Sequence, residues 1–278
     1  NFAKEFDVLL VASAGNNPGS FFEGLNGLCR DETVLCVSAT NQSDMKKQDS
    51  VYGNYVDIGA PGLTYTTNND PITKYSYHGG TSISSPIAAG AASLVRTINP
   101  SLSYRQVFSI MQASVDPFAD NTYYYGTGRI NSNKAIQMAK NSINIGSFPE
   151  SEINATTQQI GHYLNIYGHI YSPILDSFKI EIGRGIYPNT WQTIYQSNNN
   201  LDGLLYSLDL STLQFGQYQI KLTAKDIYGQ ESFDTFIFRR SYLLYENSPV
   251  YYGVSLGLLV FPTIADLDND NELEIIVA

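Results

Sequence analysis

The chain has 278 residues, 43% of them hydrophobic and 15% charged, and these ordinary globular values exclude disordered, collagen-like and coiled-coil proteins. Its length fits about two domains. The formal net charge of −10 would repel a phosphate backbone, and the best apolar run is interrupted at Pro262, so neither nucleic-acid binding nor a membrane-spanning helix is expected.

In the first half of the chain, strand-like segments alternate with helical ones. Short apolar runs bounded by turn residues are typical of buried parallel strands, and they cover residues 7–14, 33–39 and 55–59. The expected helices cover residues 85–98, 104–115 and 131–141, and Ser103 is the predicted N-cap of the second. This alternation predicts an α/β layer architecture over residues 1–142.

After residue 142 the pattern changes to apolar and polar residues in alternation, which is typical of strands with one wet face. The expected strands cover residues 163–171, 178–182, 190–195, 205–210, 218–224 and 233–238. The sequence therefore predicts an antiparallel β-sandwich over residues 143–240. A third segment, 241–278, combines a short apolar strand with an acidic loop and carries six of the acidic residues and no basic residue.

Two cysteines, Cys29 and Cys36, flank a turn-like segment that would let them meet as a disulfide. The alternative is that Cys36 is a small buried strand residue. Both remain open at this point.

One serine lies where a loop enters a helix, in Gly-Gly-Thr-Ser-Ile-Ser-Ser-Pro over residues 79–86. Backbone N–H groups at a helix N-terminus stabilise a developing oxyanion, so Ser82 is a candidate nucleophile. The alternative is a serine-rich N-cap of an ordinary buried helix. Asn16 follows the first predicted strand, where its side-chain amide could be a second donor to the same oxygen.

Four motifs in a fixed order resemble those of the subtilisin-like serine proteases. They are Ala-Gly-Asn at 14–16, Val-Asp-Ile-Gly-Ala-Pro-Gly at 56–62, Gly-Thr-Ser-Ile-Ser-Ser-Pro at 80–86 and Gly-Thr-Gly-Arg-Ile-Asn at 126–131. The resemblance implies the C-terminal part of a catalytic domain with an incomplete parallel sheet flanked by helices. It also implies that Ser82 is the nucleophile and Asn16 the oxyanion donor, with support from Thr81.

In that family the catalytic Asp and His precede the oxyanion Asn, and only 15 residues precede Asn16 here. The chain begins without Met and stops inside an apolar run, so both ends are expected to be cut. The resemblance thus implies a fragment, inactive alone, of a secreted extracellular endopeptidase that acts on peptides or proteins and needs no cofactor for catalysis. The alternative is a catalytically dead scaffold with surface-binding modules. Oligomeric state is not predicted.

A second alternative is an esterase of the α/β-hydrolase type, because residues 80–84 are one residue short of the Gly-x-Ser-x-Gly motif. Asp116 or Asp120 would then be the acid and His162 the base. This interpretation places the base in the β-rich second part of the chain, away from the sheet that carries the serine.

The last segment suggests a structural calcium site. Side-chain oxygens at Asp266, Asp268, Asp270 and Glu274, with Glu272 at the position that would offer its backbone carbonyl, can surround one hard cation. This region resembles the start of an FG-GAP or VCBS-type repeat, and residues 216–226 resemble a strand of Ig-like or fibronectin-like modules. The alternative for the loop is a solvated acidic turn that binds no cation.

Overall fold

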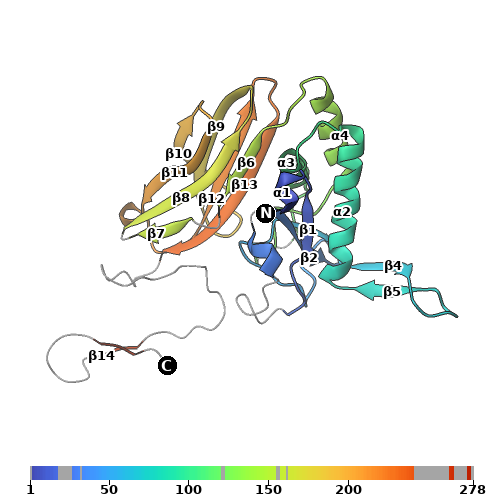
Figure 1. Cartoon of the computed structure of the whole chain (residues 1–278). Helices are drawn as coiled ribbons and strands as arrows, with labels where there is room; N and C mark the ends of the chain where they lie inside the picture. The colour runs from blue at the N-terminus through green and yellow to red at the C-terminus, as the bar shows by residue number, and fades with distance from the viewer. Residues whose placement is uncertain are drawn as a thin grey trace.

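A computed structural model describes residues 2–17, 27–31, 33–119, 123–154, 157–160, 162–240, 263–265 and 274–276. Figure 1 shows two layered bodies side by side. One, which we call the α/β unit, is a parallel sheet with helices over residues 2–148, and the other, which we call the sandwich, is a pair of antiparallel sheets over residues 150–240. This architecture confirms the predicted fold class.

The sheet of the α/β unit is parallel and has the order β1-β2-β3. Its strands are β1 (Leu10–Ser13), β2 (Val34–Thr40) and β3 (Ile58–Pro61), and two short helical elements, α1 (Phe2–Glu5) and η1 (Gly27–Arg30), flank β1. Strand β1 begins later than expected because Asp7 has a left-handed backbone (φ 53°), and its carboxylate accepts from the Tyr104 N–H and pairs with Arg96. Asp7 therefore holds the segment before β1 against the helices that carry Arg96 and Tyr104.

Three helices accompany this sheet: α2 (Thr81–Ile98), α3 (Tyr104–Ala113) and α4 (Ser132–Ile143). Helix α2 packs on all three strands, and α3 and α4 pack against α2 and each other. The predicted cap at Ser103 is confirmed, since its hydroxyl accepts from the Gln106 N–H while the Gln106 side chain accepts from the Ser103 N–H. Alanines of α2 pack on buried residues of β2 and β3 in the main core. Helix α2 starts at Thr81 rather than Ser85, so residue 82 lies inside its first turn.

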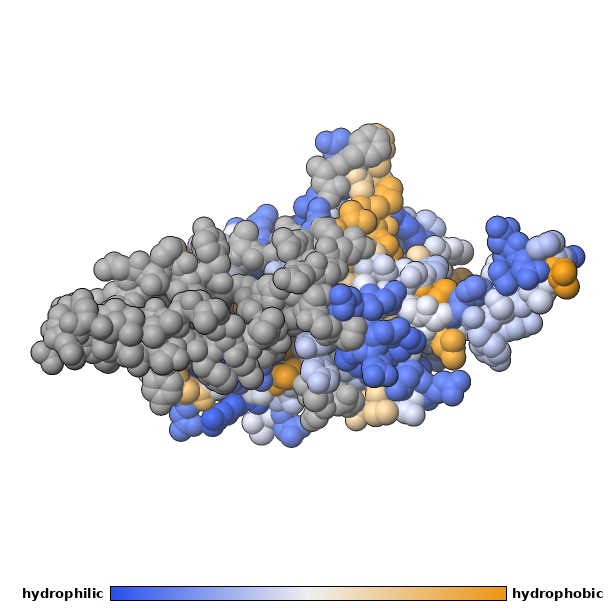
Figure 2. Space-filling model, turned by 90° about the horizontal axis from the view of Figure 1, so that it is seen from below, coloured by the Kyte–Doolittle hydropathy of each residue, from blue (hydrophilic) through white to orange (hydrophobic). Residues whose placement is uncertain are grey.

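A two-stranded hairpin of β4 (Leu63–Thr67) and β5 (Tyr75–Gly79) connects β3 to α2 and was not expected from the sequence. It projects from the body of the molecule, as Figures 1 and 2 show from two directions. Its aromatic side chains stay largely exposed, with Tyr65 stacked on Tyr75. Strand β5 leads directly into the start of α2.

The sandwich packs a sheet of order β10-β9-β12-β13 against one of order β11-β8-β6, with β7 also paired to β8. The strands are β6 (Glu150–Ile153), β7 (Gln158–Ile160), β8 (Tyr163–Tyr171), β9 (Leu175–Arg184), β10 (Gln192–Ser197), β11 (Leu201–Asp209), β12 (Gly216–Asp226) and β13 (Glu231–Arg240), with a 3-10 turn η2 (Leu210–Thr212). All six predicted strands are present, and β6 and β7 are additional. A last pair, β14 (Thr263–Ala265) and β15 (Glu274–Ile276), is antiparallel.

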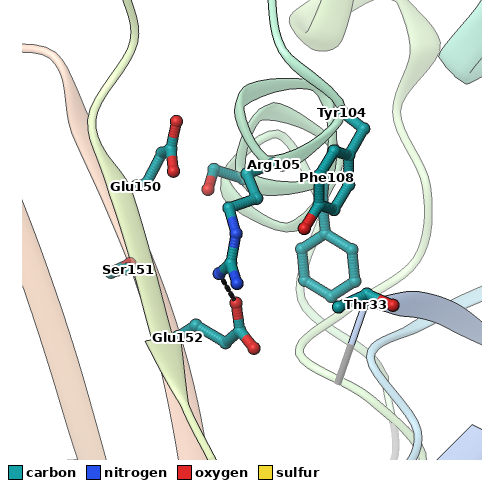
Figure 3. A pocket seen from close by; sticks show the side chains of 8 residues that line it. Thr33, Tyr104, Arg105, Phe108, Glu150, Ser151 and Glu152 are labelled. Atoms are coloured by element: carbon teal, nitrogen blue, oxygen red, sulfur yellow. Dashed lines mark hydrogen bonds and ion pairs between the residues drawn. The ribbon is translucent and has the colours of Figure 1, made fainter. Parts of the chain in front are cut away.

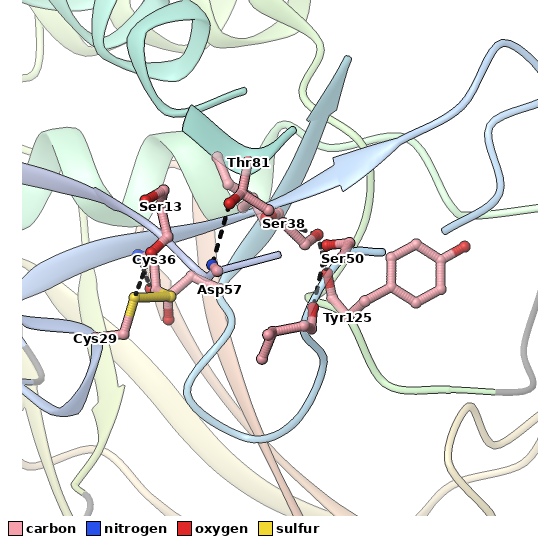
Figure 4. Close-up of a disulfide and its surroundings, with 11 residues drawn as sticks. Ser13, Cys29, Cys36, Ser38, Ser50, Asp57, Thr81 and Tyr125 are labelled. Carbon is pink, nitrogen blue, oxygen red and sulfur yellow. Dashed lines mark hydrogen bonds between the residues drawn. A yellow bond between two sulfur atoms is a disulfide. The ribbon is translucent and has the colours of Figure 1, made fainter. Parts of the chain in front are cut away.

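Cys29 and Cys36 form a disulfide with a Cα–Cα distance of 5.2 Å, which resolves the open question from the sequence (Figure 4). Both side chains are also buried, with 5% and 1% exposure, so the two alternatives coexist at Cys36. The bond joins η1 to β2, next to the strand that ends before Asn16.

Removing this bond by the double substitution Cys29→Ala and Cys36→Ala is expected to lower the free energy of unfolding by about 2.5 kcal/mol, because a loop of this length loses its entropic constraint in the unfolded chain. Urea unfolding of both proteins measures the difference. A reducing agent should destabilise the parent by a similar amount and leave the double variant unchanged. Equal stability of the oxidised and reduced parent would contradict the expectation.

Candidate active site

Ser82 is the second residue of α2 and is exposed at the helix N-terminus. Gly80 precedes the helix with φ 119°, a conformation that favours glycine, and so turns the chain sharply from β5 into α2. No acidic residue occupies the first turn, so the positive end of the helix dipole is not neutralised there.

The N–H groups of this first turn are almost all engaged. Thr81 N–H donates to the Asn16 side chain at 2.8 Å, and Ile83 and Ser84 N–H donate to the Gly80 carbonyl at 3.0 and 3.4 Å. Within the described part of the chain, the Ser82 N–H alone among these four has no acceptor. A helix start therefore presents one free donor beside a free hydroxyl.

The Asn16 carboxamide lies against the same turn. Its Oδ1 accepts from both the N–H and the hydroxyl of Thr81, at 2.8 and 3.1 Å. Because both Thr81 groups are donors, this arrangement fixes which end of the amide is the oxygen and leaves Nδ2 as the outward donor. The structure thus brings Asn16, Thr81 and Ser82 together, as the sequence motifs led us to expect.

Thr81 is fully buried, and its hydroxyl also accepts from the Gly15 N–H at 3.1 Å (Figure 4). Its one proton is directed at Asn16, so in this arrangement Thr81 holds the Asn16 amide. Ser84, which the sequence did not single out, donates to the carbonyls of Ala60 and Pro61, both at 3.1 Å. These bonds fasten the start of α2 to the end of β3, and the only sequence signal for them was the run of serines.

None of the three histidines hydrogen-bonds to Ser82 among the described residues. His78 lies on β5 with its ring 2.8 Å from the Ser76 hydroxyl, and His162 is exposed just before β8. His169 lies on β8 between Glu150 and Asp202. The chain therefore offers no base at Ser82 in the part that the structure describes.

The acid of the esterase alternative has a structural role. Asp116 accepts from Asn131 at 2.9 Å and from Lys134 at 2.5 Å, and it pairs with Arg129 at 3.2 Å. These bonds to Lys134 and Asn131 lower the pKa of Asp116. Asp120 lies outside the described residues.

The calcium prediction concerns Asp266, Asp268, Asp270 and Glu272, which lie outside the described residues, and Glu274, of which only the strand position is described. Across the residues that the structure does describe, no three His, Cys, Asp or Glu side chains are grouped to hold a metal ion. In the same residues, no helix has the length and apolar character to cross a membrane.

Comparison with known proteins gives consistent relatives. The chain is 33% identical to subtilisin BL of Lederbergia lenta over 137 residues, or 49% of each chain. It is 30% identical to thermitase of Thermoactinomyces vulgaris over 49% of this chain and 47% of that one. A solved protease of Pseudoalteromonas arctica matches with 24% identity and a TM-score of 0.43, over 49% of this chain and 44% of the other.

The chain spans about half the length of the curated relatives it matches. The model of the subtilase family matches residues 1–169, which covers the whole α/β unit and continues into β8. With a match over more than half of its residues, this chain belongs to the subtilase family.

Proposed function

We propose that this chain supplies the nucleophile and the oxyanion donors of a subtilisin-like serine endopeptidase. The observation that carries the proposal is the free Ser82 N–H at the start of α2, with the Asn16 amide held beside it by Thr81. Acyl transfer at a peptide carbonyl needs two donors for the developing oxyanion next to a hydroxyl, and we propose that the Ser82 N–H and Asn16 Nδ2 are these donors.

In the proposed reaction the Ser82 oxygen attacks the carbonyl carbon of the peptide bond, and its proton passes to a histidine base. The carbonyl oxygen gains negative charge and accepts hydrogen bonds from the Ser82 N–H and Asn16 Nδ2. The C–N bond then breaks, the leaving amine takes the proton, and water hydrolyses the ester. The base and its partner aspartate are proposed to lie in the half of the subtilase domain that this chain does not span.

Several relatives are named as alkaline proteases, and we propose peptides or proteins as substrates, without a catalytic cofactor. An extracellular location is part of the proposal, and the buried disulfide supports it because such bonds persist in oxidising compartments. The structural calcium ion, the Ig-like or fibronectin-like character of the sandwich and the FG-GAP or VCBS-type repeat remain proposals from the sequence resemblance.

The test uses the chain joined to its natural upstream sequence. A fluorophosphonate reagent is expected to label the extended protein at Ser82, and Ser82→Ala should abolish both labelling and peptide hydrolysis. Ser93→Ala, on the exposed face of the same helix, is the control and should keep both. Labelling that persists in Ser82→Ala removes the assignment, and an extended protein without label or hydrolysis favours the dead scaffold.

A further inference from the structure

The sandwich contacts the α/β unit along its edge strand β13. Asn54, in the loop before β3, uses its carboxamide to bond both main-chain groups of Ile237: Nδ2 donates to the carbonyl at 2.7 Å and Oδ1 accepts from the N–H at 3.0 Å. The side chain thus takes the place of a neighbouring strand and covers an edge that would otherwise be open. We call this contact zone between the two bodies the junction.

Tyrosines continue the junction beside Asn54. The Tyr124 hydroxyl lies 2.6 Å from the Thr235 hydroxyl on β13, and its ring stacks on Tyr187 with centroids 5.7 Å apart. Tyr187, from the loop after β9, donates its hydroxyl to the Gly126 carbonyl at 3.0 Å. Buried or half-buried polar groups of each body therefore hydrogen-bond to partners in the other body.

At the centre of the junction, one carboxylate joins three elements. Asp234 of β13 accepts from the Ile153 N–H of β6 at 2.7 Å, from the Gln112 side chain of α3 at 3.2 Å and from the Thr235 N–H at 2.8 Å. Gln112 is 1% exposed, and its Oε1 has no hydrogen-bond partner in the described part of the chain. An acceptor thus lies unused next to the carboxylate.

The other charged groups around this carboxylate are mostly acidic. Asp57, before β3, accepts from the Cys36 N–H at 2.6 Å, and Glu152 of β6 pairs with Arg105 of α3, as Figure 3 shows. Arg105 faces Glu150 and Glu152 and forms its ion pair with Glu152. Tyr124 and Tyr187 add hydroxyl groups but no charge at neutral pH. In the described part of the junction, Asp234 and Asp57 thus repel each other, while Glu150 and Glu152 face Arg105.

We propose that the junction is an acid-tightened joint, in which protonation of Asp234 strengthens the docking of the sandwich on the α/β unit. A protonated carboxyl no longer repels Asp57. It also gains a proton that the unused Gln112 oxygen can accept once that amide turns. The inference concerns the assembly of the two bodies and does not depend on peptidase activity.

The titration properties of the group agree with this geometry. Burial raises the pKa of Asp234 from 3.8 to about 6, and burial, with the charges of Asp234 and Glu152, raises the pKa of Asp57 well above its usual range. A raised carboxyl pKa means that the docked state binds the proton more tightly than the open state. Docking is therefore strongest below pH 4 and weakens as the pH rises through 6.

Hydrogen exchange of the Ile237 N–H in the full chain tests the proposal, because this group is protected by Asn54 across the junction. With pKa values of 3.8 open and about 6 docked, the opening equilibrium should rise about 25-fold between pH 4.5 and 7.5, after correction for intrinsic exchange. Asp234→Asn should cut this rise to less than about tenfold, since it removes the carboxyl whose titration gives the calculated 25-fold change.

Asp176→Asn, on an exposed acid of the same sandwich, is the matched control and should keep the parent's full rise. A rise of less than about fivefold in the parent would overturn the proposal, even if Asp234→Asn failed to fold. A rise of about tenfold or more that survives in Asp234→Asn would overturn it as well.

Discussion

Replacing Asn16 by alanine in the extended protein is expected to lower kcat about 10²–10³-fold, a magnitude carried over from subtilisin itself, while KM changes little. The reason is that, in the proposed mechanism, Nδ2 donates to an oxygen whose charge develops only during the attack by Ser82. An interaction that exists mainly in the transition state appears in kcat and not in substrate binding. Steady-state hydrolysis of a chromogenic peptide gives both constants.

Two further substitutions separate this role from a general disturbance of the site. Thr81→Ser keeps the hydroxyl that holds Asn16 at 3.1 Å, so its kcat should stay within a few-fold of the parent. Asn16→Asp keeps the size and the acceptor oxygen but replaces the outward donor by a second oxygen, so it should lose at least as much as alanine. A kcat for Asn16→Ala within about fivefold of the parent would remove Asn16 from the oxyanion site.

Local signals were enough to predict most elements of the fold. The parallel strands, the three helices and the six strands of the sandwich follow from hydrophobic periodicity, and the Ser103 cap follows from its own side chain and Gln106. The predicted starts of elements are wrong where a contact with a residue far away along the chain sets the boundary. Strand β1 starts late because Asp7 turns toward Tyr104 and Arg96, and α2 starts early because Asn16, 65 residues away, accepts the Thr81 N–H.

The candidate site also contains some residues that the sequence indicates and others that depend on long-range contacts. Ser82 and Asn16 could be proposed from the sequence because motif and local position agree for both residues. The anchoring role of Thr81 and the ties from Ser84 to β3 depend on long-range contacts, and no pattern in the sequence reports them. The contacts of the junction are still harder to predict from the sequence, because Asn54 and Asp234 are single polar residues. Their importance depends only on which strand edges face each other.

A large loss of stability is expected from Gly126→Ala, which should lower the free energy of unfolding by about 4 kcal/mol or more. Gly126 has φ 115°, where side chains are disfavoured, and a methyl group there would lie 2.8–2.9 Å from the backbone atoms of Ile58. Ile58 cannot retreat, because it is fully buried in β3 and that strand is paired with Val37 of β2. Urea unfolding followed by circular dichroism measures the loss.

Gly185→Ala separates the two causes of this loss. Gly185 has a similar backbone angle, φ 105°, but nothing lies within 4 Å of an added methyl group. It should therefore lose only the conformational part, about 1–2 kcal/mol. If the two variants unfold at the same urea concentration, contact with Ile58 is not the cause. A larger loss in Gly126→Ala means that close packing against β3, the strand that leads through the hairpin to Ser82, holds this segment in place.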